Sequence, residues 1–465
     1  MSSEAVTPNT FTQGSLATTF AKTALPIIFV MSMNGLLAVV DAVFLGVFVG
    51  PNALGAVTLM FPLYMLIAAL ATLVASGMSS LLARHLGGSR FDEARAVFAG
   101  AHGLALTLSA GLILLFLAVG RDLTLTAAAG SVPMAEMGYV YLRITVLFSP
   151  VLFVLSVNSD ALRNEGHIGF MAAASLLVSL SNIGFNYLLI AVLHLGVAGS
   201  AYGTVLAQGV AFAIILTFRI CGKTKLRPSA LWCTTPMTAW KSILALGAPQ
   251  SLNFIGLALG SAAIITALQL VESDTYATTV SAYGIITRVM TFAFLPLLGL
   301  SHALQSITGN NYGAEQWRRS DDSLRLGVAV ALAYCLIAEI ILVSLARPIG
   351  LLFVDDGDVV SEVARIMPMI VAMFFAAGPL VMIAAYFQAI GDAGRAAILG
   401  LSKPYLFAMP LTFLLPFPLG EQGIWMAGPV AEVLLLALTG CVLCRTAHQK
   451  DLRWGLFKSP SPAPQ

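Results

Sequence analysis

Polar side chains inside long apolar runs are the part of this sequence that could do chemistry. Asp41 lies about seven residues from the outer end of the first run, and Asn186 and Thr204 lie at a similar depth in two later runs. Asn182 precedes Asn186 by one helical turn, on the same helix face. Because a carboxylate costs about 2.5–3.5 kcal/mol at mid-membrane, Asp41 is a candidate functional group. Such an acid can carry H⁺, and with amide and hydroxyl oxygens it can equally hold Na⁺; the residues leave both open.

The same region offers candidates for contact with a cargo molecule. Asn34 lies two turns before Asp41, and Tyr64 presents an aromatic face that suits a cation. Met31 and Met60 carry flexible thioethers, which adapt to varied flat substrates. The alternative for these residues is ordinary packing between helices, and the alternative for the polar cluster is an interhelical hydrogen-bond network.

Three further acids fall within apolar runs. Asp160 lies near the inner end of its run and is expected to be a solvated helix end. Glu339 has apolar neighbours, and the sequence assigns it no role. Glu432 matches Gln208 in the first half and is a candidate to reach a central cavity.

The elements that hold these residues must be membrane helices. The chain has 465 residues, of which 58% are hydrophobic and 10% charged, with a net charge of +2. Its mean hydropathy is +0.90. This composition excludes a soluble enzyme, a nucleic-acid-binding protein and a disordered chain. Cys441 and Cys444 lie in an apolar run with no cluster of further Cys or His residues nearby, so neither a metal centre nor a cofactor is expected.

Each apolar run that exceeds about 20 residues predicts one transmembrane helix. The first twenty residues lack the features of a cleavable signal peptide, so the first run is expected to be a retained span. The runs are rich in Leu and Ala and lack the alternation of a β-barrel. Twelve spans are predicted, at 24–48, 54–83, 96–119, 135–160, 169–194, 197–221, 242–271, 277–308, 326–346, 360–390, 396–419 and 423–445.

Basic residues set the expected orientation. If the N-terminus is cytoplasmic, nineteen Lys and Arg residues fall inside and only Arg121, Arg347 and Arg365 outside. Both termini are therefore expected in the cytoplasm, with the chain in the inner (plasma) membrane. The basic segment around 219–241 divides the spans into two sets of six. The predicted organisation is a first bundle at 1–221, a basic cytoplasmic linker at 222–241, a second bundle at 242–446 and a cytoplasmic tail at 447–465.

The two halves repeat each other at an offset between 222 and 228. Gly77–Gly87 matches Gly299–Gly309, Ala161-Leu162 with Gly166 matches Ala389-Ile390 with Gly394, and Leu195-Gly196-x-x-Gly199 matches Leu419-Gly420-x-x-Gly423. Blocks in the same order indicate a duplication. Because each half has an even number of spans, the bundles should be related by a pseudo-two-fold axis along the membrane normal, as in transporters that work by alternating access.

The polar cluster is confined to one half. Its equivalents in the second half are about Ala263, Leu406, Pro410 and Gly428. A cluster that only held helices together would be needed in both bundles, so its absence from one favours a coupling role.

Three motifs resemble the multidrug and toxic-compound extrusion (MATE) family. Asp41-Ala-Val-Phe-x-Gly46, followed by Ala53-Leu-Gly-Ala56, resembles its first span. Gly309-Asn-Asn-Tyr-Gly313-Ala314 resembles its turn after span eight, and Leu195-Gly-x-x-Gly199-x-Ala-x-Gly-Thr204 resembles its junction of spans five and six. The resemblance covers nearly the whole chain.

The resemblance implies that the protein is embedded in the lipid bilayer and exports organic, often cationic, or amphipathic drugs. This export would be driven by the inward movement of H⁺ or Na⁺. An acid in span one is typical of the DinF-like branch, where it serves in cation coupling; Asp41 matches it, with Asn182, Asn186 and Thr204 beside it. Many relatives have Asp where this chain has Asn186, which places the number of coupled cations in question. A monomer with no nucleic-acid partner is expected. The alternative is a flippase for lipid-linked oligosaccharides or another amphipathic lipid precursor, which shares the wider superfamily fold.

Overall fold

The computed structural model describes residues 9–128, 131–222, 224–229, 231, 235–271, 276–450, 452–453 and 456–458. The first half contains α1 (Leu16–Phe44), the π-helical η1 (Leu45–Val49), α2 (Pro51–Gly87), α3 (Phe91–Ala127), α4 (Val132–Leu147), α5 (Ser149–Asn164), α6 (Ile168–Asn186), the π-helical η2 (Tyr187–Val192) and α7 (Gly196–Ile220). The second half contains α9 (Trp240–Leu270), α10 (Tyr276–Gly313), α11 (Trp317–Ser344), α12 (Ala346–Phe353), α13 (Gly357–Val371), α14 (Phe374–Ile390), α15 (Ala393–Leu401), the π-helical η3 (Ser402–Ala408), α16 (Met409–Leu414), α17 (Pro416–Leu419) and α18 (Glu421–Lys450). A short antiparallel pair, β1 (Leu452–Arg453) with β2 (Phe457–Lys458), follows. Positions 223, 230 and 232–234 of the predicted linker, the first eight residues and most of the predicted tail lie outside the described residues.

Twelve membrane spans are present if two bent helix pairs each count as one. Ten helices of the described chain are long and apolar enough to cross a membrane on their own. The helices α4 and α5 form a span bent by 49°, and α13 and α14 form one bent by 43°. Pro150 stands in the first turn of α5, and because proline lacks a backbone N–H and crowds the preceding turn, it favours a bend at this point. The bends occupy the same place in each half.

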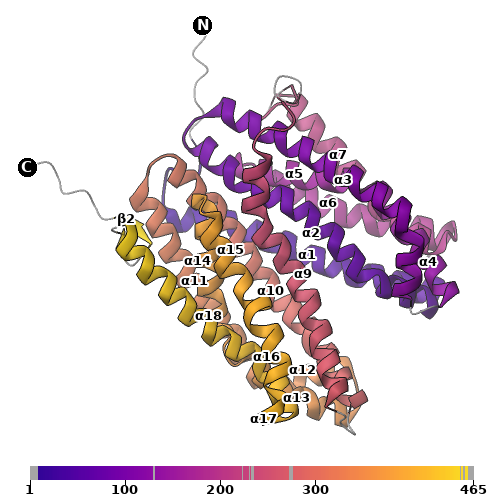
Figure 1. Ribbon diagram of the computed structural model, residues 1–465. Helices are drawn as coiled ribbons and strands as arrows, with labels where there is room; N and C mark the ends of the chain where they lie inside the picture. The colour runs from indigo at the N-terminus through magenta and orange to yellow at the C-terminus, as the bar shows by residue number, and fades with distance from the viewer. Residues whose placement is uncertain are drawn as a thin grey trace, which may run out of the picture.

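The spans form two helical bundles that meet at one end and diverge toward the other, giving a V (Figure 1). Both ends of the described chain lie at the end where the bundles meet (Figure 1). The main contacts between the bundles are α2 against α9 and α1 against α10. Since α1 and α2 are the first two spans of one repeat and α9 and α10 those of the other, these contacts are reciprocal. This confirms the predicted all-helical fold of two six-span bundles related by a pseudo-two-fold axis.

Glycines allow α2 and α9 to approach backbone to backbone. A Cβ on Gly77 would lie 2.0 Å from the carbonyl oxygen of Ile243, and a Cβ on Gly247 would lie 1.9 Å from that of Leu73. The α1–α10 contact is built similarly, because a Cβ on Gly299 would meet the Ile28 side chain at 2.7 Å. Any larger residue at these positions would push the bundles apart.

Backbone conformation confirms the duplication but corrects its register. Ser89 and Glu315 both have left-handed backbones, with φ of 56° and 58°, immediately before α3 and α11. Gly87 and Gly313 pack reciprocally, each against the backbone of the opposite helix. Gly87 is therefore equivalent to Gly313 and not to Gly309.

A second block shifts in the same way. Gly166 and Gly391 share a φ of 89° and 88°, so Gly166 matches Gly391 and not Gly394. The third predicted match, Gly196 with Gly420, is confirmed by φ values of 57° and 60°. The two errors are four and three residues, close to one helical turn. Small residues that recur at this spacing allow a sequence comparison to slip by one turn.

Candidate functional site

The Asp41 carboxylate lies inside the first bundle and accepts a hydrogen bond from α6. The Nδ2 of Asn186 is 2.5 Å from Asp41 Oδ1. Asp41 stands one turn before α1 gives way to η1, and its side chain is partly buried. Asn186 is the last residue of α6 before η2 and is fully buried. Both partners thus sit where a regular helix passes into a π-helical segment, and such segments are often found at functional sites.

The hydrogen bonds continue from Asn186 to α7. Asn186 Nδ2 also donates to Asn182 Oδ1 at 3.0 Å, and Asn182 Nδ2 donates to the Thr204 hydroxyl at 3.0 Å. If the Asn182 amide turns over, its Nδ2 comes 2.8 Å from Asp41 Oδ1 and its oxygen accepts from Thr204 Oγ1 at 3.0 Å. In either orientation the four residues form one connected network, which α1, α6 and α7 hold in place.

Gly203 makes room for this network. It precedes Thr204 on α7, and a Cβ there would lie 2.1 Å from Asn186 Oδ1. That oxygen is buried and accepts no hydrogen bond from the described residues. A buried, unsatisfied oxygen beside a carboxylate can serve as a ligand for a cation or as an acceptor for a donor group.

Two tyrosines lie in the region around the Asp41 carboxylate. Tyr64 of α2 and Tyr141 of α4 both lie within electrostatic range of Asp41. Tyr64 also stacks on Phe61, with ring centroids 6.4 Å apart. Tyr64 was predicted from the sequence, whereas Tyr141 was not. Its signal in the sequence is weak, because neither residue type nor spacing distinguishes Tyr141 from Tyr139 in the same span.

The other predicted cargo contacts are separated from this cluster. Asn34 lies on α1 about 10 Å from the level of Asp41 and its side chain is exposed. Met31 packs against the large apolar core shared with the second bundle. Met60 is fully buried in the core of the first bundle and abuts Gly138. A cargo molecule could reach Met60 only after that core repacks.

The remaining intramembrane acids have structural partners. Asp160 is not a solvated helix end: it forms an ion pair of 2.9 Å with Arg163, whose side chain is only 3% exposed. Glu339 accepts a hydrogen bond of 2.7 Å from the backbone N–H of Phe375, at the start of α14. It thereby satisfies a free N–H that the bend between α13 and α14 creates.

Glu432 of α18 does not stand alone but pairs with Lys403 of η3. The pair lies inside the second bundle, where the sequence predicted only an acid. The second oxygen of Glu432 is buried and has no hydrogen-bond partner among the described residues. The second bundle therefore carries an ion pair, whereas the Asp41 carboxylate of the first has no cationic partner among the described residues.

A second polar cluster joins the two bundles near their meeting point and was missed by the sequence analysis. Gln305 Nε2 of α10 donates to Ser80 Oγ of α2 at 2.7 Å. Arg163 of α5 donates to Ser79 at 2.9 Å and to Ser306 at 3.1 Å. These side chains are buried, so the contacts replace water at the seam. Small hydroxyl residues next to Gly77 were the available signal, but their partners come from the other half of the chain.

Two duplicated six-span bundles with a polar site between the helices of one of them define a multi-pass membrane protein of the two-bundle transporter class. The MatE family model matches residues 26–188 and 254–414, which is more than half of the chain. The chain belongs to the MatE family of multidrug and toxin extrusion transporters, whose members are transporters and not enzymes.

Relatives and solved structures agree with this assignment. The chain is 24% identical over 392 residues to an FAD transporter of Shewanella oneidensis, covering 83% of this chain and 85% of the relative. It is 22% identical to the multidrug export protein MepA of Staphylococcus haemolyticus, covering 91% and 92%. A structure described as the outward-facing conformation of a multidrug resistance MATE transporter matches with a TM-score of 0.85 and 22% identity, over 94% of this chain and 97% of that one.

Proposed function

We propose that this protein exports organic compounds, often cationic or amphipathic, in exchange for inward H⁺ or Na⁺, with Asp41 as the coupling carboxylate. The observation that carries the proposal is the hydrogen bond from Asn186 to Asp41 inside a bundle whose twin has no equivalent acid at that position. The second bundle instead holds the Lys403–Glu432 ion pair, in which a cation already balances the acid, whereas Asp41 has no cationic partner among the described residues.

Coupling requires that the site respond to the charge of Asp41. The ionised carboxylate accepts the Asn186 hydrogen bond, whereas the protonated carboxyl has one oxygen that becomes a donor. When Asp41 gains or loses a proton, the Asn182 amide can turn over as well. Both orientations of this amide form hydrogen bonds among Asp41, Asn186 and Thr204. Loss or gain of one proton would thus alter the contacts between α1, α6 and α7, and so the shape of the first bundle.

Sodium would use the same oxygens. Asp41, the free Oδ1 of Asn186, the Asn182 oxygen and the Thr204 hydroxyl supply hard oxygen ligands from three helices. One acid favours exchange of one H⁺ for one monovalent cation, which is electroneutral and is driven by ~1.36 kcal/mol per pH unit. A second coupled H⁺ would add ~2.3 kcal/mol per 100 mV of membrane potential.

Alternating access follows from the same geometry. The bundles meet at the end that holds both termini, which the basic residues predict to be cytoplasmic, so the conformation described here is outward-facing. Transport then requires the seam of Ser79, Ser80, Arg163, Gln305 and Ser306 to open. Each of its hydrogen bonds is a neutral or singly charged contact of modest net strength, about 0.5–3 kcal/mol, which is compatible with reversible opening.

Everted membrane vesicles test the function directly. Vesicles with the protein should accumulate a fluorescent cationic dye when a pH step or a Na⁺ step is imposed, and vesicles without it should not. An FAD arm tests whether the cargo resembles that of the Shewanella relative. If neither gradient drives uptake of any cationic, amphipathic or anionic cargo, the proposed export function is wrong.

A further inference from the structure

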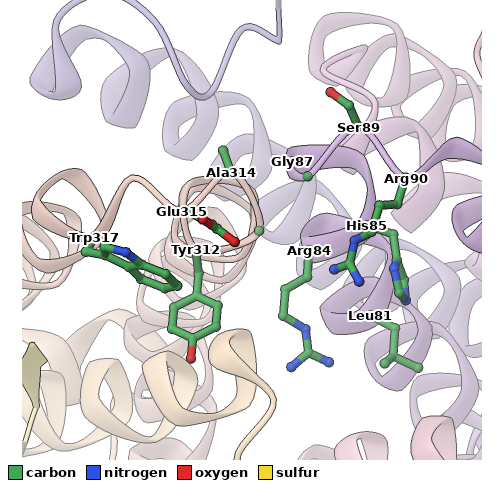
Figure 2. Close-up of a pocket in the computed structure, with 12 residues that line it drawn as sticks. Leu81, Arg84, His85, Gly87, Ser89, Arg90, Tyr312, Ala314, Glu315 and Trp317 are labelled. Atoms are coloured by element: carbon green, nitrogen blue, oxygen red, sulfur yellow. The ribbon is translucent and has the colours of Figure 1, made fainter.

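A cavity of about 830 Å³ lies between the two bundles, at the end where they meet. Its walls come from both repeats: the end of α2 with the turn before α3, and the end of α10 with the turn before α11 (Figure 2). These are the two turns whose backbones match at Ser89 and Glu315. The volume falls in the usual range for small-molecule sites, roughly 300–1,000 Å³.

Arg84 is the unmatched cation of this cavity. Its side chain forms no hydrogen bond or ion pair with any described residue, although it is only partly exposed. The guanidinium instead fills the space beside Gly391, where a Cβ would lie 1.3 Å from Arg84 Nη1. This places the cation against the C-terminal turn of α14, so Arg84 reaches from the first bundle into the second.

Tyr312 faces Arg84 from the other bundle. Figure 2 shows the two side chains on opposite sides of the cavity, with Trp317 beside Tyr312. The Tyr312 hydroxyl forms no hydrogen bond with a described residue but lies within electrostatic range of Arg84. Its ring packs edge-on against Trp317, with centroids 4.9 Å apart, which fixes its direction. The N–H donors of the Arg84 guanidinium and the hydroxyl donor of Tyr312 thus face the same cavity.

The other charged groups at the cavity, apart from Glu315, are already paired. Glu93 binds both His85, at 2.7 Å, and Arg90, at 3.1 Å. Glu315 also lines the cavity, and its carboxylate forms no ion pair with a described residue. The charges around the rim therefore nearly cancel. Arg84 is a cation of the cavity wall that has no anionic partner among the described residues.

We propose that this cavity binds a phosphate group, held by the Arg84 guanidinium and the Tyr312 hydroxyl. Arginine binds phosphate oxygens through two parallel N–H donors, and Tyr312 would donate to a third oxygen. The phosphate belongs either to a free anion of the cytoplasm or to a lipid headgroup. Because its ligands come from α2 and α10, the bound group ties the two bundles together.

A regulatory consequence rests on the proposed function. If transport requires the bundles to separate at this end, a phosphate that bridges Arg84 and Tyr312 stabilises the present conformation and slows turnover. The binding itself does not depend on transport, and it can be measured on a variant that carries no cargo.

Thermal unfolding of the purified full chain tests the binding. In detergent, inorganic phosphate should raise the unfolding temperature above that in chloride of equal ionic strength. Arg84→Gln and Tyr312→Phe should each weaken the apparent affinity at least tenfold. Arg90→Gln is the matched control, since Arg90 already binds Glu93, and it should respond like the wild type. Asp41→Asn should also retain the response, which separates failure of this site from failure of the coupling proposal.

Nanodiscs distinguish the sources of the phosphate. Stabilisation by phosphatidylglycerol over phosphatidylcholine, with no further effect of inorganic phosphate, identifies a lipid headgroup. Stabilisation by inorganic phosphate in phosphatidylcholine discs identifies a free anion. Equilibrium dialysis of radiolabelled phosphate with Tyr312→Phe, which keeps the aromatic ring, guards against a folding defect. An equal response in Arg84→Gln and wild type, or no response to either source, overturns the proposal.

Discussion

Gly203 and Asn186 are fitted to each other: a Cβ on Gly203 would lie 2.1 Å from the Asn186 amide oxygen. The position of Asn186 against Asp41 therefore depends on a residue with no side chain. A substitution at Gly203 can therefore change how Asp41, Asn182 and Asn186 are arranged without changing any of these three residues.

Gly203→Ala should displace the Asn186 amide and weaken coupled uptake about tenfold, because a shift near 1 Å at a functional group has large kinetic effects. The added methyl should also cost about 1–3 kcal/mol of stability through overpacking. Gly209→Ala on the same helix is the control, since a Cβ there meets nothing within 4 Å. Equal dye uptake by the two variants at equal expression would show that the Asn186 position does not matter.

Asn186→Asp should change the stoichiometry of exchange. A second carboxylate 2.5 Å from Asp41 cannot stay ionised together with it, so an additional H⁺ or Na⁺ must enter the site. Uptake should become sensitive to the membrane potential while remaining driven by the ion gradient. Measuring dye uptake with and without a K⁺ diffusion potential tests this, and an unaltered voltage dependence would contradict it.

The Lys403–Glu432 pair predicts a non-additive effect on stability. Removal of one partner from a buried pair costs about 3–5 kcal/mol, and less here because Lys403 is 31% exposed to solvent. Lys403→Met and Glu432→Gln should each lower the unfolding temperature, and the double variant should lose less than the two losses added together. Additive losses in thermal unfolding would mean that the two side chains act independently.

Glu339 should stabilise the bend between α13 and α14. Glu339→Leu removes the acceptor of the Phe375 N–H and should cost about 1–3 kcal/mol, whereas Glu339→Gln keeps an oxygen there and should cost less. Unfolding temperatures of the two variants measure the difference. If the leucine variant is as stable as the glutamine variant, the hydrogen bond does not hold the bend.

Much of the fold could be predicted from the sequence because a membrane restricts the alternatives. Apolar length predicts spans, and small residues near Gly77 and Gly299 indicated the duplication. The register of the repeat was wrong by one turn in two blocks, since the pattern of small residues survives such a slip. The register is determined by the left-handed backbones of Ser89 and Glu315, and of Gly166 and Gly391, together with the reciprocal packing of Gly87 and Gly313.

The contacts of the site were predictable where they depend only on how deep each residue lies in the membrane. Asp41, Asn186 and Thr204 were placed together by counting residues from the helix ends, and the structure joins them. The partners of Glu339 and Glu432 were not predictable, because each depends on helix rotation or on a bend that sequence spacing does not define. The partner of Asp160 could have been predicted, because Arg163 lies three residues later on the same helix. Arg84 and Tyr312 come from different halves, so only the packing of the two bundles reveals that they face each other.

The central claim is that Asp41 couples cargo movement to the ion gradient. Coupled and uncoupled flux should be compared in proteoliposomes of wild type and Asp41→Asn, with Asp122→Asn, on the exposed end of α3, as the control. We predict that Asp41→Asn loses uphill dye accumulation after a pH or Na⁺ step but keeps dye exchange at equilibrium. Uphill accumulation by Asp41→Asn equal to that of the wild type would contradict the claim.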